Sequence, residues 1–110
     1  MIRSLLALEG VIVVCRFRDD GALEEGHGLV TEEEMARLAR FAHDYRRMLQ
    51  ANADQLSMFT QVSGWTPPQG WVVRSLGRTV CSVGNVVCVA SNEDCSLNSI
   101  LEELQEVARY

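Results

Sequence analysis

The sequence predicts a single α+β domain in which helices cover a five-stranded antiparallel sheet. Three features predict it. Val11–Phe17 is a run of β-branched and aromatic residues whose two faces are both largely apolar, as in a central strand. A long amphipathic pattern follows Thr31. Residues 71–90 contain apolar runs separated by short glycine-containing turns. The expected order is helix, two strands, long helix, three strands and helix.

The N-terminal part of the chain is expected to form a short helix and a β-hairpin. Apolar residues at positions 2, 5, 6 and 8 have helical spacing, and Gly10 ends the helix. After the strand Val11–Phe17, the Asp-Asp-Gly sequence at 19–21 has the chemistry of a tight turn. Residues 22–30 are predicted to return as a more polar strand, which suits the edge of a sheet.

The longest predicted element is a helix that begins after Thr31. Thr31 and Glu34 form a capping box, in which Thr31 accepts from the amide of Glu34 while the glutamate reaches back. The apolar pattern predicts a helix from Glu32 to about Ala51, with a possible extension to residue 62 and a candidate interruption at 52–54. Glycines and prolines between 64 and 70 then exclude regular structure.

The C-terminal part is predicted to be a three-stranded meander and a closing helix. The expected strands are 71–76, 79–83 and 86–90, joined by two-residue turns at 77–78 and 84–85. Gly84 at the first position of its turn favours type II′. Ser96 is among the candidate caps of a helix whose apolar stripe runs from Leu97 to position 108.

Composition excludes several classes of function. The chain has 110 residues, a net charge of −5 and ten basic residues, all of them arginine. Without lysine it cannot form a P-loop, a pyridoxal Schiff base or a kinase phosphate site. An acidic protein is not expected to bind nucleic acid. No apolar run approaches the roughly 20 residues that span a bilayer, and the N-terminus lacks a secretory signal, so we expect a cytoplasmic location.

The four cysteines have no spacing typical of a zinc site. In a reducing cytosol they are expected to be small core residues. Counting from the turn at 84–85, Cys81 faces Cys88 at a hydrogen-bonded pair, where a disulfide is possible by distance but not favoured. If the first strand lies beside the fifth, Cys15 approaches Cys88. A three-thiol cluster of Cys15, Cys81 and Cys88 for metal or sulfur chemistry is therefore an alternative hypothesis.

The long helix carries most of the candidate charged groups. Arg40, His43 and Arg47 share a face, while Arg46 lies away from them. One interpretation is a cationic surface for an acidic partner, because guanidinium groups bind carboxylates through two hydrogen bonds. The other is a solvated face partly paired with Asp44 and with the glutamates that start the helix.

No catalytic group is predicted. General acid–base chemistry needs a perturbed pKa in a cleft, and the candidate groups are expected in a turn, on an edge strand or at the exposed surface. These groups are Asp19, Asp20, Glu24, Glu25, His27 and His43. Both histidines are read as exposed.

The aromatic residues and Met48 are either core residues or interface anchors. Core packing is favoured for Tyr45 and Phe59. Trp65 and Trp71 flank a Pro-Pro loop and are harder to bury fully, so both interpretations stay open for them.

The order of these motifs resembles the Roadblock family of dynein light chains and bacterial GTPase regulators. The resemblance starts with Leu-Glu-Gly-Val at 8–11 and the Asp-Asp-Gly turn at 19–21. It continues through the long helix after Thr31 to Ser-Val-Gly-Asn-Val-Val-Cys-Val at 82–89. It extends over essentially the whole chain and is closest to small bacterial Roadblock-related proteins of uncharacterised function. The segment 52–70 departs from the general family pattern.

The resemblance implies a profilin-like architecture and a binding function. The implied sheet order is 2-1-5-4-3, with the long helix on one face and the two terminal helices on the other. It also implies a homodimer joined through strand 71–76 and the long helices, no catalytic residue or cofactor, and a role as regulator or scaffold for small Ras-like GTPases. The implied dimer or partner interface comprises Arg37, Arg40, Arg47, Met48, Trp65, Trp71 and Val73. The alternatives are the thiol- or metal-binding redox accessory protein described above and an assembly scaffold without a GTPase partner.

Overall fold

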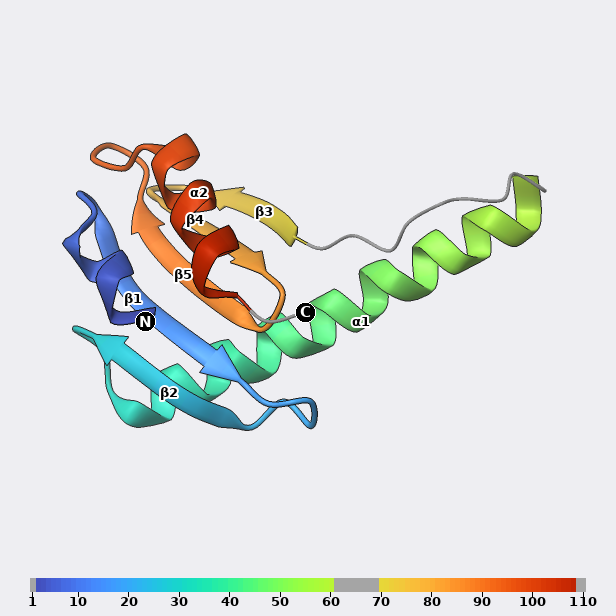
Figure 1. Cartoon of the computed structure of the whole chain (residues 1–110), viewed down its shortest axis with the longest axis horizontal. Helices are drawn as coiled ribbons and strands as arrows, with labels where there is room; N and C mark the ends of the chain where they lie inside the picture. The colour runs from blue at the N-terminus through green and yellow to red at the C-terminus, as the bar shows by residue number, and fades with distance from the viewer. Residues whose placement is uncertain (1, 61–69, 109–110) are drawn as a thin grey trace.

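A computed structural model describes residues 2–60 and 70–108, and side chains throughout these ranges except at 52–60. Two helices and a short 3₁₀ helix surround one five-stranded sheet (Figure 1). Along the chain the elements are η1 (Ile2–Ala7), β1 (Val11–Phe17), β2 (Leu23–Gly28), α1 (Glu32–Thr60), β3 (Gly70–Ser75), β4 (Arg78–Val83), β5 (Val86–Ser91) and α2 (Leu97–Val107).

The sheet has the order β2-β1-β5-β4-β3, and all neighbouring strands are antiparallel. The predicted α+β fold class and the implied strand order 2-1-5-4-3 are confirmed. β5 is the central strand and lies between β1 and β4, and the interior position of β1 agrees with the apolar character of both faces of Val11–Phe17. β2 and β3 form the two edges of the sheet.

Each face of the sheet has its own core. On one face, η1 and α2 pack against inward side chains of β1, β4 and β5, among them Val14 and Cys88, and α2 contributes Leu104. On the other face α1 packs through Met35, Ala39 and neighbouring residues against a second cluster. The long helix and the two terminal helices therefore cover opposite faces, as the resemblance implies (Figure 1).

Three local expectations for residues 1–60 differ from the structure. The N-terminal element is a 3₁₀ helix rather than an α-helix. The candidate interruption at 52–54 is wrong, because α1 continues to Thr60. Asn and Asp only weakly disfavour a helix interior, and this stretch contains neither glycine nor proline. The second strand is shorter than predicted and ends at Gly28. The possible extension of α1 to residue 62 lies outside the described residues.

The two glycine turns of the meander fix the register of β3, β4 and β5. Gly84 has a φ of 58°, which agrees with the first central position of a type II′ turn. The other turn is one residue earlier than predicted and consists of Leu76 and Gly77, because Ser75 pairs with Arg78. Gly77 has a φ of 79° at the second central position, where a type II turn requires a positive φ.

Both predicted helix caps are present. Thr31 Oγ1 accepts from the amide of Glu34 at 3.1 Å. The Glu34 carboxylate accepts from the Thr31 hydroxyl, whereas in the usual capping box it accepts from the Thr31 amide. Ser96 caps α2 by accepting from the amide of Ser99. No helix in the described part of the chain combines the length and the apolar character that a membrane span needs.

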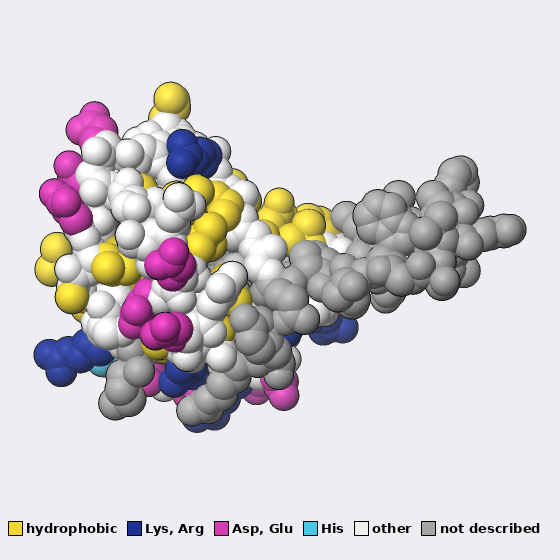
Figure 2. Space-filling view, turned by 45° about the horizontal axis from the view of Figure 1, so that its top comes forward, with side chains coloured by type: hydrophobic (Ala, Val, Ile, Leu, Met, Phe, Trp, Pro, Cys, Tyr) yellow, Lys and Arg dark blue, Asp and Glu magenta, His cyan; other side chains and the backbone are white. Residues whose placement is uncertain are grey.

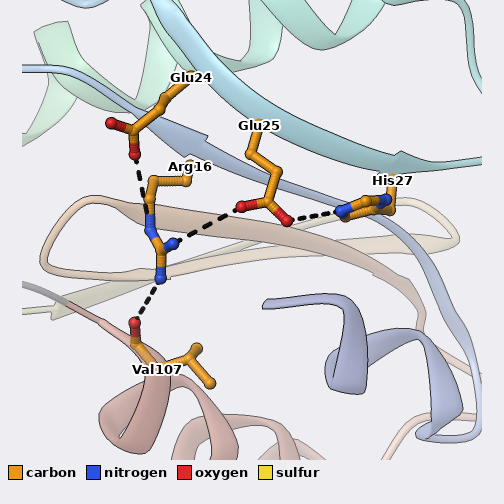
Figure 3. Close-up of polar contacts among 5 residues, drawn as sticks. All are labelled: Arg16, Glu24, Glu25, His27 and Val107. Atoms are coloured by element: carbon orange, nitrogen blue, oxygen red, sulfur yellow. Dashed lines mark hydrogen bonds and ion pairs between the residues drawn. The ribbon is translucent and has the colours of Figure 1, made fainter. Parts of the chain in front are cut away.

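A buried arginine joins the sheet to the end of α2 (Figure 3). Arg16, only 8% exposed, donates from Nη2 to the carbonyl oxygen of Val107 at 2.8 Å. Its guanidinium also lies 3.7 Å from Glu25 and 4.0 Å from Glu24, and Glu25 in turn contacts His27 at 2.7 Å. A cation at this position complements the negative end of the α2 dipole and thereby fixes the helix on the sheet.

Candidate functional site

The edge strand β3 exposes an open row of backbone groups. It pairs with β4 on one side, and no described strand lies on its other side. Its six pairs with β4 are in continuous register. The other edge, β2, carries glutamates and pairs with β1 through an irregular register. Charges and bulges of that kind discourage pairing with another chain, whereas a regular edge of Trp71, Val72 and Val73 permits it.

Beside this edge, α1 and β3 form an aromatic cluster of Phe41, Tyr45 and Trp71. The Phe41 and Tyr45 rings stack at 5.6 Å, and Trp71 packs edge-on against Tyr45 at 4.8 Å and Phe41 at 5.9 Å. Phe41 and Met48 are each 48% exposed, and both lie on the turns of α1 that carry Tyr45. Figure 2 shows hydrophobic side chains gathered at the surface where α1 leaves the body of the molecule.

The aromatic residues were interpreted either as core residues or as interface anchors, and the members of this cluster differ in which of the two they fit. Tyr45 and Trp71 are half-buried, so they contribute to both the domain and its surface. Phe41 was not predicted as part of an interface. Its signal in the sequence is the series 41, 45 and 48, which follows helical spacing on a different side of the helix from the buried Met35 and Ala39. The side chain of Phe59, and Trp65 as a whole, lie outside the described part.

The predicted cationic face of the long helix is divided rather than continuous. Arg37 pairs with Glu33 at 3.1 Å at the exposed surface. Arg40 donates to the carbonyl oxygen of Asp20 at 2.6 Å and so is bound to the β1–β2 turn. Arg47 is exposed. Contrary to expectation, Arg46 lies with Arg47, because both line the same hollow.

His43 is buried, and its predicted exposure is wrong. It is 8% exposed, and its Nε2 lies 2.7 Å from the carbonyl oxygen of Asp19. Its Nδ1 lies 3.0 Å from Asp44, and this hydrogen bond lowers the pKa of the Asp44 carboxyl below its usual value. The ring packs edge-on against Phe17. The β1–β2 turn folds over the helix at this point, a non-local contact that helical spacing does not encode. His27 is half-buried and paired with Glu25.

The cysteines do not form a three-thiol cluster. Cys81 and Cys88 are directly opposite one another in β4 and β5, as predicted, and both thiols are free. They face η1 and α2, whereas Cys15 faces α1 on the other side of the sheet. Among the described residues, no group of three cysteine, histidine or acidic side chains is arranged to hold a metal ion. The three-thiol cluster of the redox alternative is therefore wrong, because the strand register puts Cys15 on the opposite face of the sheet from Cys81 and Cys88.

The environments of the thiols predict low reactivity for three of them. Burial raises the pKa of Cys15 to about 12. A hydrogen bond between the paired thiols lowers the pKa of Cys81 and raises that of Cys88, whose burial raises it further. Cys95 is only half-buried. Because the thiolate is the nucleophile, access and ionisation decide the rate of alkylation.

We expect native protein treated with iodoacetamide at pH 8 to be alkylated at Cys95 first. The three buried thiols must wait for local opening, which slows them by at least about 100-fold. Peptide mass spectrometry over time measures the order, and alkylation in denaturant is the control in which all four react. Fast modification of Cys15, Cys81 or Cys88 in the native protein would return the redox hypothesis to consideration.

Comparisons with known proteins agree with this architecture. The family model described as "Uncharacterized conserved protein (DUF2173)" matches residues 1–106. The Roadblock/LC7 domain from Streptomyces avermitilis is similar with a TM-score of 0.74 and 13% identity, over 96% of this chain and 86% of that one. MglB in a tetrameric arrangement is similar with a TM-score of 0.76 and 13% identity, over 96% of this chain and 77% of that one. Myxococcus xanthus MglB is similar with a TM-score of 0.64 and 14% identity, over 87% of this chain and 76% of that one. No curated protein matches the sequence significantly. At these identities the similarity establishes the fold.

Proposed function

Because the chain belongs to the DUF2173 family of uncharacterized conserved proteins and has the Roadblock/LC7 fold, we propose that it is a homodimeric, non-enzymatic module that binds a small Ras-like GTPase. The observation that carries the proposal is the open, regular edge of β3 beside the exposed aromatic cluster of α1. A surface of this kind suits association rather than catalysis.

Self-association is supported by the chemistry of the edge. Two copies related by a two-fold axis place the same strand against itself, so β3 pairs antiparallel with β3 of the second copy. The ten strands then form one continuous sheet, in which the open backbone groups of both edges are satisfied. Phe41 and Met48 of each copy are brought to the same side of that seam, where aromatic and methionine side chains are favoured.

The GTPase partner is supported by the fold and by the charge on α1. Small GTPases are the partners implied by the Roadblock resemblance. Within this chain, Arg37 and Arg47 are exposed on the long helix and are available to acidic groups of a partner. The scaffold without a GTPase partner stays the competing hypothesis, and nucleotide dependence separates the two.

We expect light scattering at concentrations on the order of tens of micromolar to give twice the 12.3 kDa mass of one chain. The physical reason is that a continuous ten-stranded sheet removes both β3 edges from water. Dilution should shift the mass toward that of the monomer, which gives the dissociation constant. A strict monomer across the whole concentration range contradicts the homodimer.

The GTPase is tested separately, with the purified protein immobilised and lysate from its own source supplied with GDP or with a non-hydrolysable GTP analogue. We expect a GTP-binding protein to be retained more strongly with one nucleotide than with the other. An Arg37→Glu variant should retain at least about tenfold less of it, since charge reversal at a contact costs more than 1.4 kcal/mol. Capture that is equal with both nucleotides favours the scaffold.

A further inference from the structure

A hollow of about 230 Å³ lies where α1 meets two turns of the sheet. The β1–β2 turn supplies Arg18 and Asp19, and the β4–β5 turn supplies Asn85. One side of α1 supplies the rest of the wall, at positions with the helical spacing 43, 46, 47 and 50. The hollow thus belongs to the sheet and the helix together, and its parts come from three segments distant in sequence. Its lining residues are Phe17, Arg18, Asp19, His43, Arg46, Arg47, Gln50 and Asn85.

Three arginine side chains converge on this hollow without an ion-pair partner in the described part of the chain. Arg18, Arg46 and Arg47 have no carboxylate within ion-pair distance there, whereas Arg16 pairs with Glu25 and Arg37 with Glu33. The Nε of Arg46 is buried and has no hydrogen-bond acceptor there. That atom is closed to solvent, so an anion in the hollow binds the part of the half-buried Arg46 guanidinium that stays accessible, together with the other arginines.

The charge of the wall indicates which anion fits. The three guanidinium groups outnumber the carboxylate of Asp19 in the wall and that of Asp44 beside it, so positive charge is in excess here, in a protein whose net charge is −5. His43 adds no free donor, because both its ring nitrogens already contact Asp19 and Asp44. A phosphate group carries the complementary charge and offers several acceptor oxygens to donors that approach from different segments. A single carboxylate has only two acceptor oxygens and leaves several of these donors unmatched.

We propose that this hollow is a binding site for the phosphate group of a small phosphorylated ligand. The volume is below the roughly 300 Å³ at which sites for drug-sized ligands begin, so it accepts a phosphate with a small substituent. Arg18, Arg46 and Arg47 bind the oxygens, and Gln50 supplies a further amide donor at the wall.

The site is independent of the proposed dimer. The residues of α1 that line it follow the series 43, 46, 47 and 50, whereas the aromatic cluster uses 41, 45 and 48. The two series lie on different sides of the helix. Failure of the phosphate site therefore leaves the dimer intact, and the reverse also holds.

The test is a titration of the full-length protein followed by amide chemical shifts, at constant ionic strength, with inorganic phosphate, phenyl phosphate and succinate as separate probes. We expect saturable shifts with both phosphates at residues 18–19, 46–50 and 85, and much weaker binding of succinate. Phenyl phosphate binding more tightly than inorganic phosphate indicates a phosphorylated organic ligand; equal affinities indicate that the phosphate alone is recognised. Succinate binding as tightly as phosphate overturns the proposal, as does the absence of saturation.

Neutral variants locate the binding on the proposed residues. Arg46→Gln and Arg18→Gln should each weaken phosphate binding by at least about tenfold, because each removes a charge-assisted hydrogen bond. Arg46→Lys keeps the charge and should lose less. Arg37→Gln changes an arginine on the same helix outside the hollow and should leave the affinity unchanged. An equal loss in Arg37→Gln would falsify the site, since it shows only general charge attraction. Arg18 lies in a turn, so its variant remains informative if Arg46→Gln fails to fold.

Discussion

A Val72→Pro variant is expected to be monomeric at concentrations where the parent chain is a dimer. Counting from the turn at Leu76 and Gly77, the pair Ser75–Arg78 is hydrogen-bonded, and so are the pairs of Val73 and Trp71 with β4. The backbone groups of Val72 therefore point to the open edge of β3. Proline removes a donor there and places its ring against an incoming strand, while the β4 ladder stays intact.

The expected loss is at least about 100-fold in the dimer dissociation constant. Each lost hydrogen bond costs about 1 kcal/mol and each acceptor left unsatisfied about 1–3 kcal/mol. A two-fold axis applies every substitution twice, and 2.7 kcal/mol corresponds to a factor of about 100. Sedimentation equilibrium measures the constant for both proteins.

Val73→Pro and Leu29→Ser serve as controls. Val73 donates toward β4, so proline at this position should unfold the meander as well as the dimer, which circular dichroism detects. Leu29 is an exposed apolar residue beyond the end of β2, and its change should leave the dimer unaltered. A Val72→Pro variant that dimerises like the parent shows that the copies associate through another surface. The result of the GTPase experiment would then be explained with a dimer built through that other surface.

Local chemistry predicted most of the fold. The β-branched run of β1 has the predicted boundaries, and the Thr31 cap marks the start of α1. The turn at Gly84 sets the register in which Cys81 faces Cys88. In each case the signal lies within a few residues of the structure that it determines, because turns and caps are fixed by local backbone geometry.

Contacts between distant segments were less accessible to sequence reasoning. Cys15 pairs with Val87, not with Cys88, and this one-residue offset puts the two thiols on opposite faces of the sheet. Nothing near Cys15 in the sequence encodes the offset. His43 presents the same difficulty, since its burial depends on the β1–β2 turn folding over α1.

The candidate sites combine predicted and unpredicted residues for the same reason. Trp71 and Met48 were expected from their residue types, which are favoured at interfaces. Phe41 shares the helical spacing of Tyr45 and Met48, but its contact with Trp71 appears only when α1 is placed against β3. The phosphate hollow requires Arg18 to meet Arg46 across 28 positions of sequence, and the helical face on which Arg46 lies is shared with core residues.

Replacing Arg16 is expected to lower the stability of the domain itself. Its guanidinium binds the last carbonyl group of α2, and its aliphatic stem is buried between the sheet and that helix (Figure 3). The contacts with Glu24 and Glu25 are long, at 4.0 and 3.7 Å, and both carboxylates are partly exposed. They therefore contribute less than the single bond of 2.8 Å to Val107.

Arg16→Ala should lower the free energy of unfolding by about 3 kcal/mol, from the loss of a charge-assisted hydrogen bond and of the buried stem. For a domain of this size that is a decrease of about 12 °C in Tm, measured by calorimetry. Arg16→Met keeps the stem and should cost about 1 kcal/mol, because Val107 is half-buried and water reaches its carbonyl group.

The matched control is Arg37→Ala, since Arg37 is also paired with a glutamate but is exposed on α1. Exposed pairs at this spacing contribute about 0.3–0.5 kcal/mol, so Tm should barely change. Hydrogen exchange gives a second readout, because loss of the Arg16 bond should speed exchange at the C-terminal turn of α2 before it affects β1. If Arg16→Met costs as much as Arg16→Ala, the charge of the guanidinium and not its stem fixes α2. If neither changes Tm, the helix is positioned by Ile100 and Leu104, whose side chains are buried against the sheet, and the arginine is dispensable.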